Sequence, residues 1–409
     1  MWLPLHLAVS LPISRLEDIE TLFTANPAAI KAGADETSKL NPCHLAAMMK
    51  NPRMEIIQRL EMYYPRFGSS LDNYSNTSLH CAARHSNSAA MIRELAQLHP
   101  AALEMENEDG DTPLHAAAIW SSSVEVVPEL IALCPAALVT RNGKGETPLM
   151  AIITTSKNSP ECHWKLQLLL EAAPQAARIP SLPLHYILRR RYPPATSEQV
   201  AMVLAAYREA VNIPSSGGSL PIFIAAEFAS LDVMKMIAEE NMSNLSAKSL
   251  MGLSVAHWAA RGHRLENLRY IYSMMPELLL SPDNWNATPL HFLIVYGKEF
   301  MRQPLSAASD VLRFLLRHCP SLAATKNSHG WTLYDSLPAR DVGFAYARRL
   351  LLLAGASSLY PGVLQEMNYA ARREALLLFH SAATRPSIFY RIRYSAGGPE
   401  LMRTIVGFL

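Results

Sequence analysis

The chain has 409 residues, half of them hydrophobic and 18% charged, which is too apolar for a disordered protein. Its formal net charge is only +2, whereas a general nucleic-acid binder has a strongly basic surface. No apolar run approaches the roughly 18 residues that a membrane span needs, and the N-terminus lacks the pattern of a secretory signal. The five cysteines form no CxxC pair, so we expect neither a disulfide framework nor a zinc site. The sequence therefore predicts an intracellular protein, cytoplasmic or nuclear.

A short motif recurs along the chain and sets its organisation. Its clearest copy is Thr112-Pro113-Leu114-His115-Ala116-Ala117, and it returns as Thr288-Pro289-Leu290-His291. Including weaker copies, it begins at residues 3, 41, 77, 112, 147, 182, 220, 254, 288 and 332. The steps between copies are 34 to 38 residues, except the last, which is 44. So steady a period predicts one array of repeats in place of two or three globular domains.

This motif and its period resemble those of the ankyrin-repeat family, in which T-P-L-H-x-A belongs to a repeat of about 33 residues made of a turn and two helices. The resemblance implies an all-α fold, an ankyrin-repeat α-solenoid of helix-turn-helix repeats with short tip turns. We expect about ten repeats in residues 1–357. Residues 358–409 are then a helical C-terminal cap with a basic-aromatic tail, because an open solenoid end needs cover.

Within a repeat, the residue types predict the local structure in chain order. Asn107 and Gly110, five and two residues before the motif, favour a tight projecting turn. Thr112 is the predicted N-cap of the first helix, and Pro113 follows at a position where its missing N–H costs nothing. Residues 124–133 have the broad apolar face of the second helix.

A proline ends the second helix of most repeats, whereas the common family pattern ends in Gly-Ala-Asp. Because proline cannot continue a helix and displaces the residue before it from the α region, it replaces glycine as a stop signal. These residues are Pro27, Pro100, Pro135, Pro174, Pro276 and Pro320.

Histidine occupies the fourth motif position in seven copies: His6, His44, His80, His115, His185, His257 and His291. Packed helices of successive repeats lie about 10 Å apart, too far for these rings to share one metal ion. We expect structural histidines, each hydrogen-bonded to its own turn or the next. The cysteines are interpreted as packing residues. No catalytic constellation is evident, so we predict no enzyme activity, no cofactor and no metal.

The resemblance implies that a protein partner binds along the tips and first helices. The candidate partner-binding residues are Asp109, Asp111, Trp120, Lys144, Glu146, Trp285, Asn286, His329 and Trp331. Projecting Trp side chains suit interface anchors, although packing across neighbouring tips is an alternative. The predicted function is a non-enzymatic protein–protein interaction scaffold. We expect it to be a monomer without nucleic-acid or membrane partners.

The C-terminal segment suggests a second function. Residues 399–409 resemble the opening helix of an F-box, although they cover only eleven residues of a motif that runs several dozen. The alternative is therefore a substrate-recruiting adaptor of a ubiquitin ligase. Residues 372–403 carry six Arg and two Glu, a local charge of +4, with aromatic residues interleaved. An ordinary cap surface is preferred there over a site for an acidic partner.

Overall fold

The computed structural model describes residues 4–11, 15–30, 39–49, 53–63, 70–155, 160–178, 182–190, 194–296, 307–330 and 333. The chain divides into two compact units, Met1–Ala210 and Val211–Leu409. The predicted cap of residues 358–409 and nearly all of the tenth repeat lie outside the described residues. The predicted boundary at residue 357 and the count of ten repeats therefore stay predictions.

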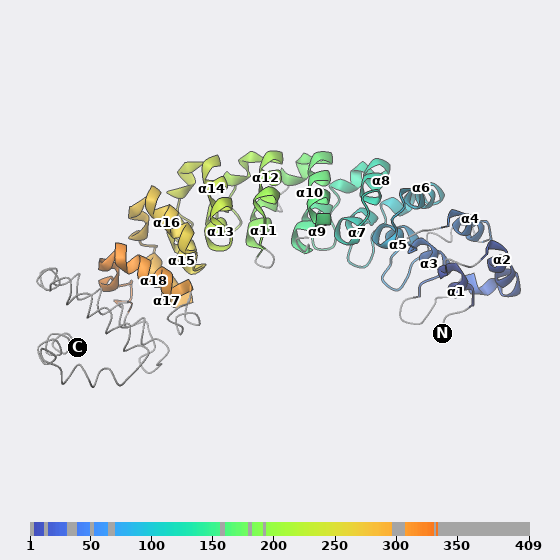
Figure 1. Ribbon diagram of the computed structural model, residues 1–409, viewed down its shortest axis with the longest axis horizontal. Helices are drawn as coiled ribbons and strands as arrows, with labels where there is room; N and C mark the ends of the chain where they lie inside the picture. The colour runs from blue at the N-terminus through green and yellow to red at the C-terminus, as the bar shows by residue number, and fades with distance from the viewer. Residues whose placement is uncertain are drawn as a thin grey trace, which may run out of the picture. The chain divides into compact units, whose positions relative to one another are not determined.

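The first unit is built from helix pairs that stack side by side, with the first helices in one row and the second helices in another (Figure 1). The first helices are α1 (Pro4–Ser10), α3 (Pro42–Ala47), α5 (Ser78–His85), α7 (Pro113–Trp120), α9 (Pro148–Thr155) and α11 (Pro183–Arg189). The second helices are α2 (Leu16–Ala25), α4 (Met54–Tyr63), α6 (Ala89–Leu98), α8 (Val126–Leu133), α10 (Pro160–Ala172) and α12 (Ser197–Ala206). From α1 to α11, neighbouring first helices of this unit pack on one another.

The second unit repeats the same arrangement. Its first helices are α13 (Pro221–Phe228), α15 (Val255–Arg261) and α17 (Pro289–Tyr296). Its second helices are α14 (Leu231–Glu240), α16 (Leu265–Met274) and α18 (Ala307–His318). Within the described residues, every element is a helix, and nine helix pairs follow the motif copies that begin at residues 3 to 288. The predicted all-α solenoid of helix-turn-helix repeats is confirmed.

A short 3₁₀ turn begins at every predicted stop proline. Helix α8 ends at Leu133, Cys134 leaves the helical region at φ −140° and ψ 78°, and the turn η4 (Pro135–Leu138) follows. The same sequence of elements gives η1 (Pro27–Ile30), η3 (Pro100–Leu103), η5 (Pro174–Arg178), η8 (Pro276–Leu279) and η10 (Pro320–Ala324). Two more such turns, η6 (Arg208–Asn212) and η7 (Met242–Leu245), form without proline at their start. The stop signal is confirmed, and the turn that it starts is a feature that the sequence did not predict.

Helix α8 begins at Val126, two residues later than predicted. Val124 lies in the preceding turn and is exposed. A helix beginning at Val124 would need Pro128 to donate an N–H to the carbonyl of Val124, and proline has none. Starting at Val126 places Pro128 in the first turn, where the N–H groups have no partner within the helix.

The core lies between the two helix rows within each unit. In the fourth repeat, Leu114 and Ala117 of α7 are buried as predicted, and Val127 and Leu130 of α8 are buried opposite them. Small alanine side chains let the backbones of neighbouring first helices approach closely. Each repeat therefore buries its apolar face only with the help of its neighbours, as solenoid repeats do.

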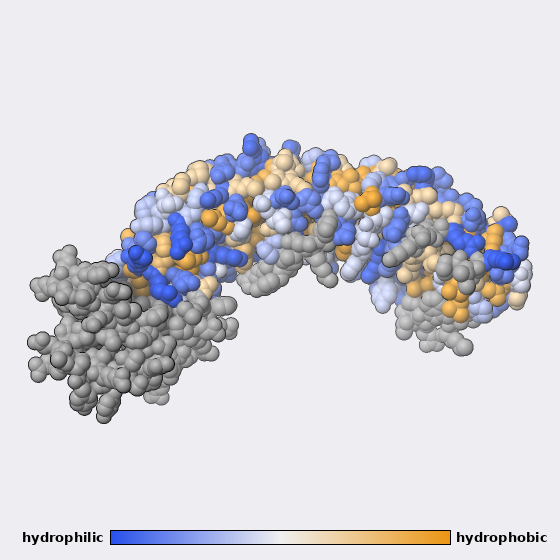
Figure 2. Space-filling model, in the orientation of Figure 1, coloured by the Kyte–Doolittle hydropathy of each residue, from blue (hydrophilic) through white to orange (hydrophobic). Residues whose placement is uncertain are grey.

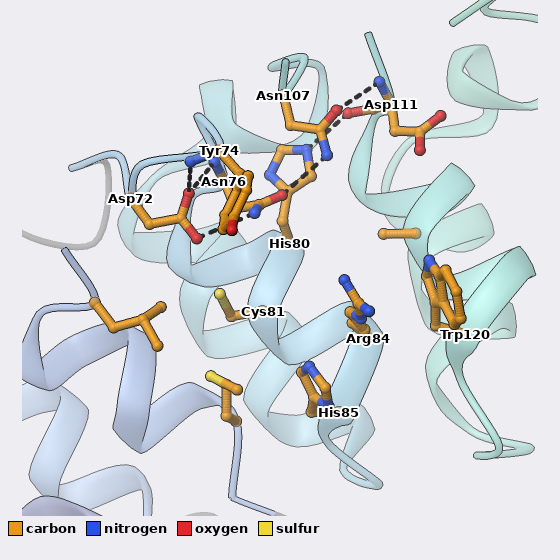
Figure 3. Close-up of a pocket in the computed structure, with 13 residues that line it drawn as sticks. Asp72, Tyr74, Asn76, His80, Cys81, Arg84, His85, Asn107, Asp111 and Trp120 are labelled. Carbon is orange, nitrogen blue, oxygen red and sulfur yellow. Dashed lines mark hydrogen bonds between the residues drawn. The ribbon is translucent and has the colours of Figure 1, made fainter. Parts of the chain in front are cut away.

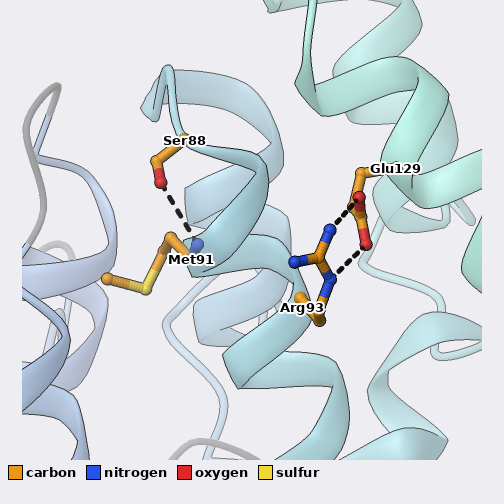
Figure 4. A network of polar contacts seen from close by, with 4 residues as sticks. All are labelled: Ser88, Met91, Arg93 and Glu129. Carbon is orange, nitrogen blue, oxygen red and sulfur yellow. Dashed lines mark hydrogen bonds and ion pairs between the residues drawn. The ribbon is translucent and has the colours of Figure 1, made fainter.

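The second helices are also joined at the surface of the first unit. The Arg93 guanidinium of α6 donates to both carboxylate oxygens of Glu129 on α8, at 2.7 and 2.9 Å (Figure 4). Ser88 caps α6, because its hydroxyl accepts the N–H of Met91 at 3.3 Å. Arg93 is about half exposed, so solvent screens this pair and it adds little to stability.

The described surface carries hydrophilic and hydrophobic residues interspersed on the face seen in Figure 2. None of the helices in the described ranges combines the length and the apolar character that crossing a membrane requires. All five cysteines are free and buried, so their predicted packing role is confirmed.

Candidate functional site

The tips are ordered by one side chain at the start of each turn. Asn107 accepts the N–H groups of Asp109 and Asp111 with its Oδ1 atom, at 3.0 and 2.9 Å. Gly110 completes the turn at φ 75°, a left-handed conformation that glycine adopts without strain. Equivalent bonds to the following turn are made by Asp72, Asn142 and Asp283. The predicted turn is confirmed, and it fixes where the tip side chains project.

Four of the motif histidines link their repeat to the next. His80 accepts the N–H of Thr77 with Nδ1 at 3.2 Å, which leaves the ring proton on Nε2. That nitrogen donates to the carbonyl oxygen of Asp111 in the next tip at 2.9 Å. His44, His115 and His257 make the same pair of bonds. The structural role is confirmed for these four rings.

Burial keeps these rings neutral. It lowers the pKa of His44, His80 and His115, and it lowers the pKa of His257 and His291 to about 4. Desolvation is the largest cause in every case, because it disfavours the charged imidazolium. With both ring nitrogens engaged in hydrogen bonds, His80 and its equivalents have no lone pair to offer a metal ion. Among the described residues, no group of three or more His, Cys, Asp or Glu is placed to hold one.

Two predicted residues of the fourth tip have different surroundings. Asp109 is exposed, and its carbonyl oxygen accepts the N–H of Gly143 in the next tip at 2.9 Å. Asp111 is buried, and its carboxylate accepts the side-chain amide of Asn142 at 2.8 Å. Asp111 therefore joins neighbouring tips, whereas Asp109 presents its side chain to solvent.

The remaining predicted residues lie at other tips. Lys144 is exposed and Glu146 is half-buried in the fifth repeat, within the first unit. In the second unit, Trp285 and His329 are exposed at consecutive tips. Asn286 is exposed at φ 59°, and its side chain donates to the carbonyl of Lys326 at 2.6 Å. Trp331 lies outside the described residues.

A hollow of about 260 Å³ opens in the first unit between the tips and the first helices α3, α5 and α7 (Figure 3). It brings together two of the predicted residues, Asp111 and Trp120. The others do not line it. Its lining residues are Leu40, Met48, Asp72, Tyr74, Asn76, His80, Cys81, Arg84, His85, Asn107, Asp111, Ala116 and Trp120.

The hollow exists because two inward positions carry small side chains. Numbered from the first residue of each motif copy, Cys81 and Ala116 occupy the fifth position of the third and fourth repeats. Tyr74 and Trp120 stand beside them with 59% and 57% of their surface exposed. Two large aromatic rings beside two small residues leave a concave surface with apolar walls, a shape typical of binding sites.

The two ends of the hollow differ in character. Figure 3 shows Asp72, Asn76 and Asn107 at the tip end, where hydrogen bonds join them to the turns. At the other end, the guanidinium of Arg84 lies over the ring of Trp120, 4.5 Å from its centroid. Partial burial and the charge of Arg84 lower the pKa of His85 beside it. At neutral pH, Arg84 is therefore the cation of this end.

Sequence reasoning missed several residues of the hollow. Tyr74, Arg84, Met48 and Cys81 were not among the candidates, because each was judged only within its own repeat. A comparison of the fifth and eighth motif positions between repeats would have found the small residues and Arg84. The fifth position ranges from Ala to Trp, and the eighth from Glu to Arg.

Comparisons with known proteins agree with the architecture. A family model described as ankyrin repeats in three copies matches residues 43–137 and 79–178. No curated protein matches the chain. Among the solved structures, the chain is similar to one described as the Bd0816 predatory endopeptidase from Bdellovibrio bacteriovorus in complex with the immunity protein Bd3460. The identity is 17% and the TM-score 0.38, over 48% of this chain and 96% of that chain, which is too weak a likeness to indicate a shared function.

Proposed function

The chain is an ankyrin-repeat protein, and we propose that it is a non-enzymatic scaffold that binds a protein partner through the hollow of its first unit. Ankyrin repeats in general indicate protein–protein interaction. The observation that carries the proposal is the pair of exposed aromatic side chains, Tyr74 and Trp120, standing beside the small residues Cys81 and Ala116. We propose further that the chain acts as an intracellular monomer and that its partner is neither a nucleic acid nor a membrane.

Aromatic side chains at a concave surface are the residues that most often dominate binding energy. Trp120 already has its ring oriented by Arg84, so little side-chain freedom remains to be lost on binding. The tips around the hollow are tied together: Glu108 donates its N–H to the carbonyl of Tyr74 at 3.0 Å. A surface that is rigid before binding loses less entropy when the partner arrives.

The other proposed surfaces have less support. Trp285 is half exposed at a tip of the second unit, but it does not line the hollow of the first unit. Residues 399–409, on which the ubiquitin-ligase alternative depends, lie outside the described residues. The hollow is therefore the site to test first.

The test uses a random-sequence peptide library displayed on phage and selected on the full chain. Selected peptides are synthesised, and their dissociation constants are measured for the wild type and two variants. Trp120→Ala removes the wall of the hollow, and Trp285→Ala removes a Trp of similar exposure from the second unit as the matched control. We expect Trp120→Ala to weaken binding at least about ten-fold and Trp285→Ala to change it less than about two-fold. Peptides that bind both variants as they bind the wild type would overturn the proposal.

A further inference from the structure

Arginine occupies the eighth motif position three times, as Arg84 in the third repeat, Arg189 in the sixth and Arg261 in the eighth, and two of these, Arg84 and Arg261, stand against a tryptophan. Both guanidinium groups lie over a tryptophan ring: Arg84 over Trp120 at 4.5 Å, and Arg261 over Trp258 at 5.2 Å from the ring centroid. The two sites thus share a cation placed against an aromatic face. They differ in what completes the arrangement.

In the second unit, the chain itself supplies a carboxylate. The Nε atom of Arg261 lies 3.2 Å from Oε1 of Glu227, the eighth-position residue of the preceding repeat. The side chain of Glu227 is only 3% exposed, so this ion pair is held at a largely desolvated place on the inner face. The arginine, the aromatic ring and the carboxylate form one closed group, which leaves little for an outside anion to bind.

In the first unit, the corresponding carboxylate is missing. The eighth position of the repeat before Arg84 is Met48, which lines the hollow. Within the described part of the chain, Arg84 has its contact with Trp120 and no carboxylate partner. The nearest acidic residues of the hollow, Asp72 and Asp111, are engaged in the tips. The Asp72 carboxylate accepts hydrogen bonds from the backbone and side-chain amides of Asn76 in its own turn. The Asp111 carboxylate accepts a hydrogen bond from the side-chain amide of Asn142 in the next tip.

We propose that Arg84 binds the carboxylate of an Asp or Glu side chain in the partner protein, in the place that Glu227 takes beside Arg261. An apolar side chain next to that acid enters the hollow against Tyr74 and Trp120. Guanidinium–carboxylate pairs are directional and strong where water is partly excluded, as it is against the Trp120 ring. This inference rests on the proposed function and names the chemistry of the partner at the same site.

The experiment is a charge swap between the chain and the selected peptides. The peptides are made with amidated C-termini, so that only side chains supply carboxylates. We expect an acidic residue beside an apolar one in most of them. Arg84→Glu should weaken the binding of these peptides at least about ten-fold. Peptides whose acidic residue is changed to Lys should regain binding to the Arg84→Glu variant but not to the wild type. Arg141→Glu, an exposed change of the same charge outside the hollow, is the control and should alter binding less than about two-fold.

A second variant tests the same point without touching the arginine. Met48→Glu supplies an internal carboxylate at the position that Glu227 has in the second unit. It should therefore compete with the peptide acid and weaken binding by a similar factor. Circular dichroism of each variant, compared with the wild type, establishes that the repeats remain folded.

The outcomes separate this inference from the proposed function. Peptides that lose binding with Trp120→Ala but are indifferent to Arg84→Glu and Met48→Glu would overturn the inference and leave the binding site in place. Peptides that are indifferent to Trp120→Ala, or a selection that yields none, would overturn both. A Lys peptide that binds Arg84→Glu no better than the acidic peptide does would also contradict the carboxylate site.

Discussion

The inner faces of the two units are built on the same repeat but differ at the fifth and eighth motif positions. In the third and fourth repeats, the fifth position holds Cys81 and Ala116, and the surface is hollowed. In the eighth and ninth repeats, the same position holds Trp258 and Phe292. The Trp258 ring stacks on Phe223, with centroids 6.1 Å apart and planes at 4°. Small fifth-position residues beside the exposed rings of Tyr74 and Trp120 therefore leave a concave surface in the first unit, whereas large rings occupy the same position in the second.

The framework around that position is shared. His80 in the first unit and His257 in the second make the same bonds to their own cap and to the next tip. Asn107 and Asp283 order their turns in the same way. The other motif residues build the scaffold in both units, and in the proposed function the fifth and eighth positions set its binding properties.

The largest effect is expected where the inner face is filled. Trp258→Ala removes a half-buried ring from between Phe223 and Arg261, and it should lower the free energy of unfolding by about 3 kcal/mol. Urea unfolding followed by circular dichroism measures the change. Trp285→Ala, a change of the same side chain at an exposed tip, should cost less than about 1 kcal/mol. Equal losses of unfolding free energy in the two variants would contradict this prediction.

The shared histidine framework should respond to acid. The pKa of His257 is about 4 in the folded chain against 6.5 for the free side chain, so the unfolded chain binds more protons between these values. The stability that neutral His257 contributes is complete above pH 6.5 and is lost as the pH falls toward 4, by about 3 kcal/mol in total.

His257→Gln removes this titration while keeping a polar side chain. Urea unfolding of both proteins between pH 7 and pH 4 should show the wild type losing more stability than the variant on acidification. Parallel curves for the two proteins would contradict the assigned role of the ring.

A third difference between the units lies in the second helices. Lys165, buried in α10, donates to the carbonyl oxygens of Ala118 and Ser121 at 2.7 and 2.9 Å. Asn267 in α16 donates to the carbonyls at the same two motif positions in its own unit, at 3.1 and 3.3 Å. Each side chain donates hydrogen bonds to carbonyl oxygens at the end of a first helix, but only the lysine carries a charge.

Lys165→Met should cost about 2 kcal/mol and Asn267→Ala about 1 kcal/mol, because each leaves carbonyl oxygens without a donor. Burial lowers the pKa of Lys165 in the folded chain below 10.5, its value in the unfolded chain. At a pH between these two pKa values, the unfolded chain therefore binds more protons than the folded chain. Stability of the wild type should therefore rise with pH through that window, relative to Lys165→Met. Asn267→Ala should show no such dependence relative to the wild type, and a matching slope in both variants would contradict the account.

The variable position itself can be exchanged between the units. Ala116→Trp carries the large residue of the second unit's fifth position into the hollow. Peptide binding should weaken at least about ten-fold, which corresponds to about 1.4 kcal/mol. Val124→Trp, at an exposed turn position outside the hollow, is the control. If Ala116→Trp binds the peptides with unchanged affinity, the hollow is not their binding site.

Much of the framework could be predicted from the sequence, because many of the motif residues act within their own repeat. Asn107, Gly110 and Thr112 satisfy local backbone needs, so their roles followed from residue type and spacing. The start of α8 was missed by two residues because the consequence of Pro128 four positions on was overlooked. The burial of Asp111 could not be predicted, since it depends on an amide from the next tip.

The hollow was beyond single-repeat reasoning. It forms because the side chains of Cys81 and Ala116 are small and because the aromatic rings beside them come from different repeats. Trp120 was identified from its exposed position, but the significance of Arg84 depends on Met48 in the repeat before it. Such properties arise from packing between repeats and become visible only when equivalent positions are compared in space.

The most direct test of the central claim is photo-crosslinking of a selected peptide to the full chain. The apolar residue of the peptide is replaced by benzoylphenylalanine, and the attached residue is identified by mass spectrometry. Benzophenone reacts readily with methionine, and the chain offers Met48 in the hollow and the exposed Met251 at a tip of the second unit. Attachment at Met48 is predicted. Attachment at Met251, with none in the hollow, would contradict the account.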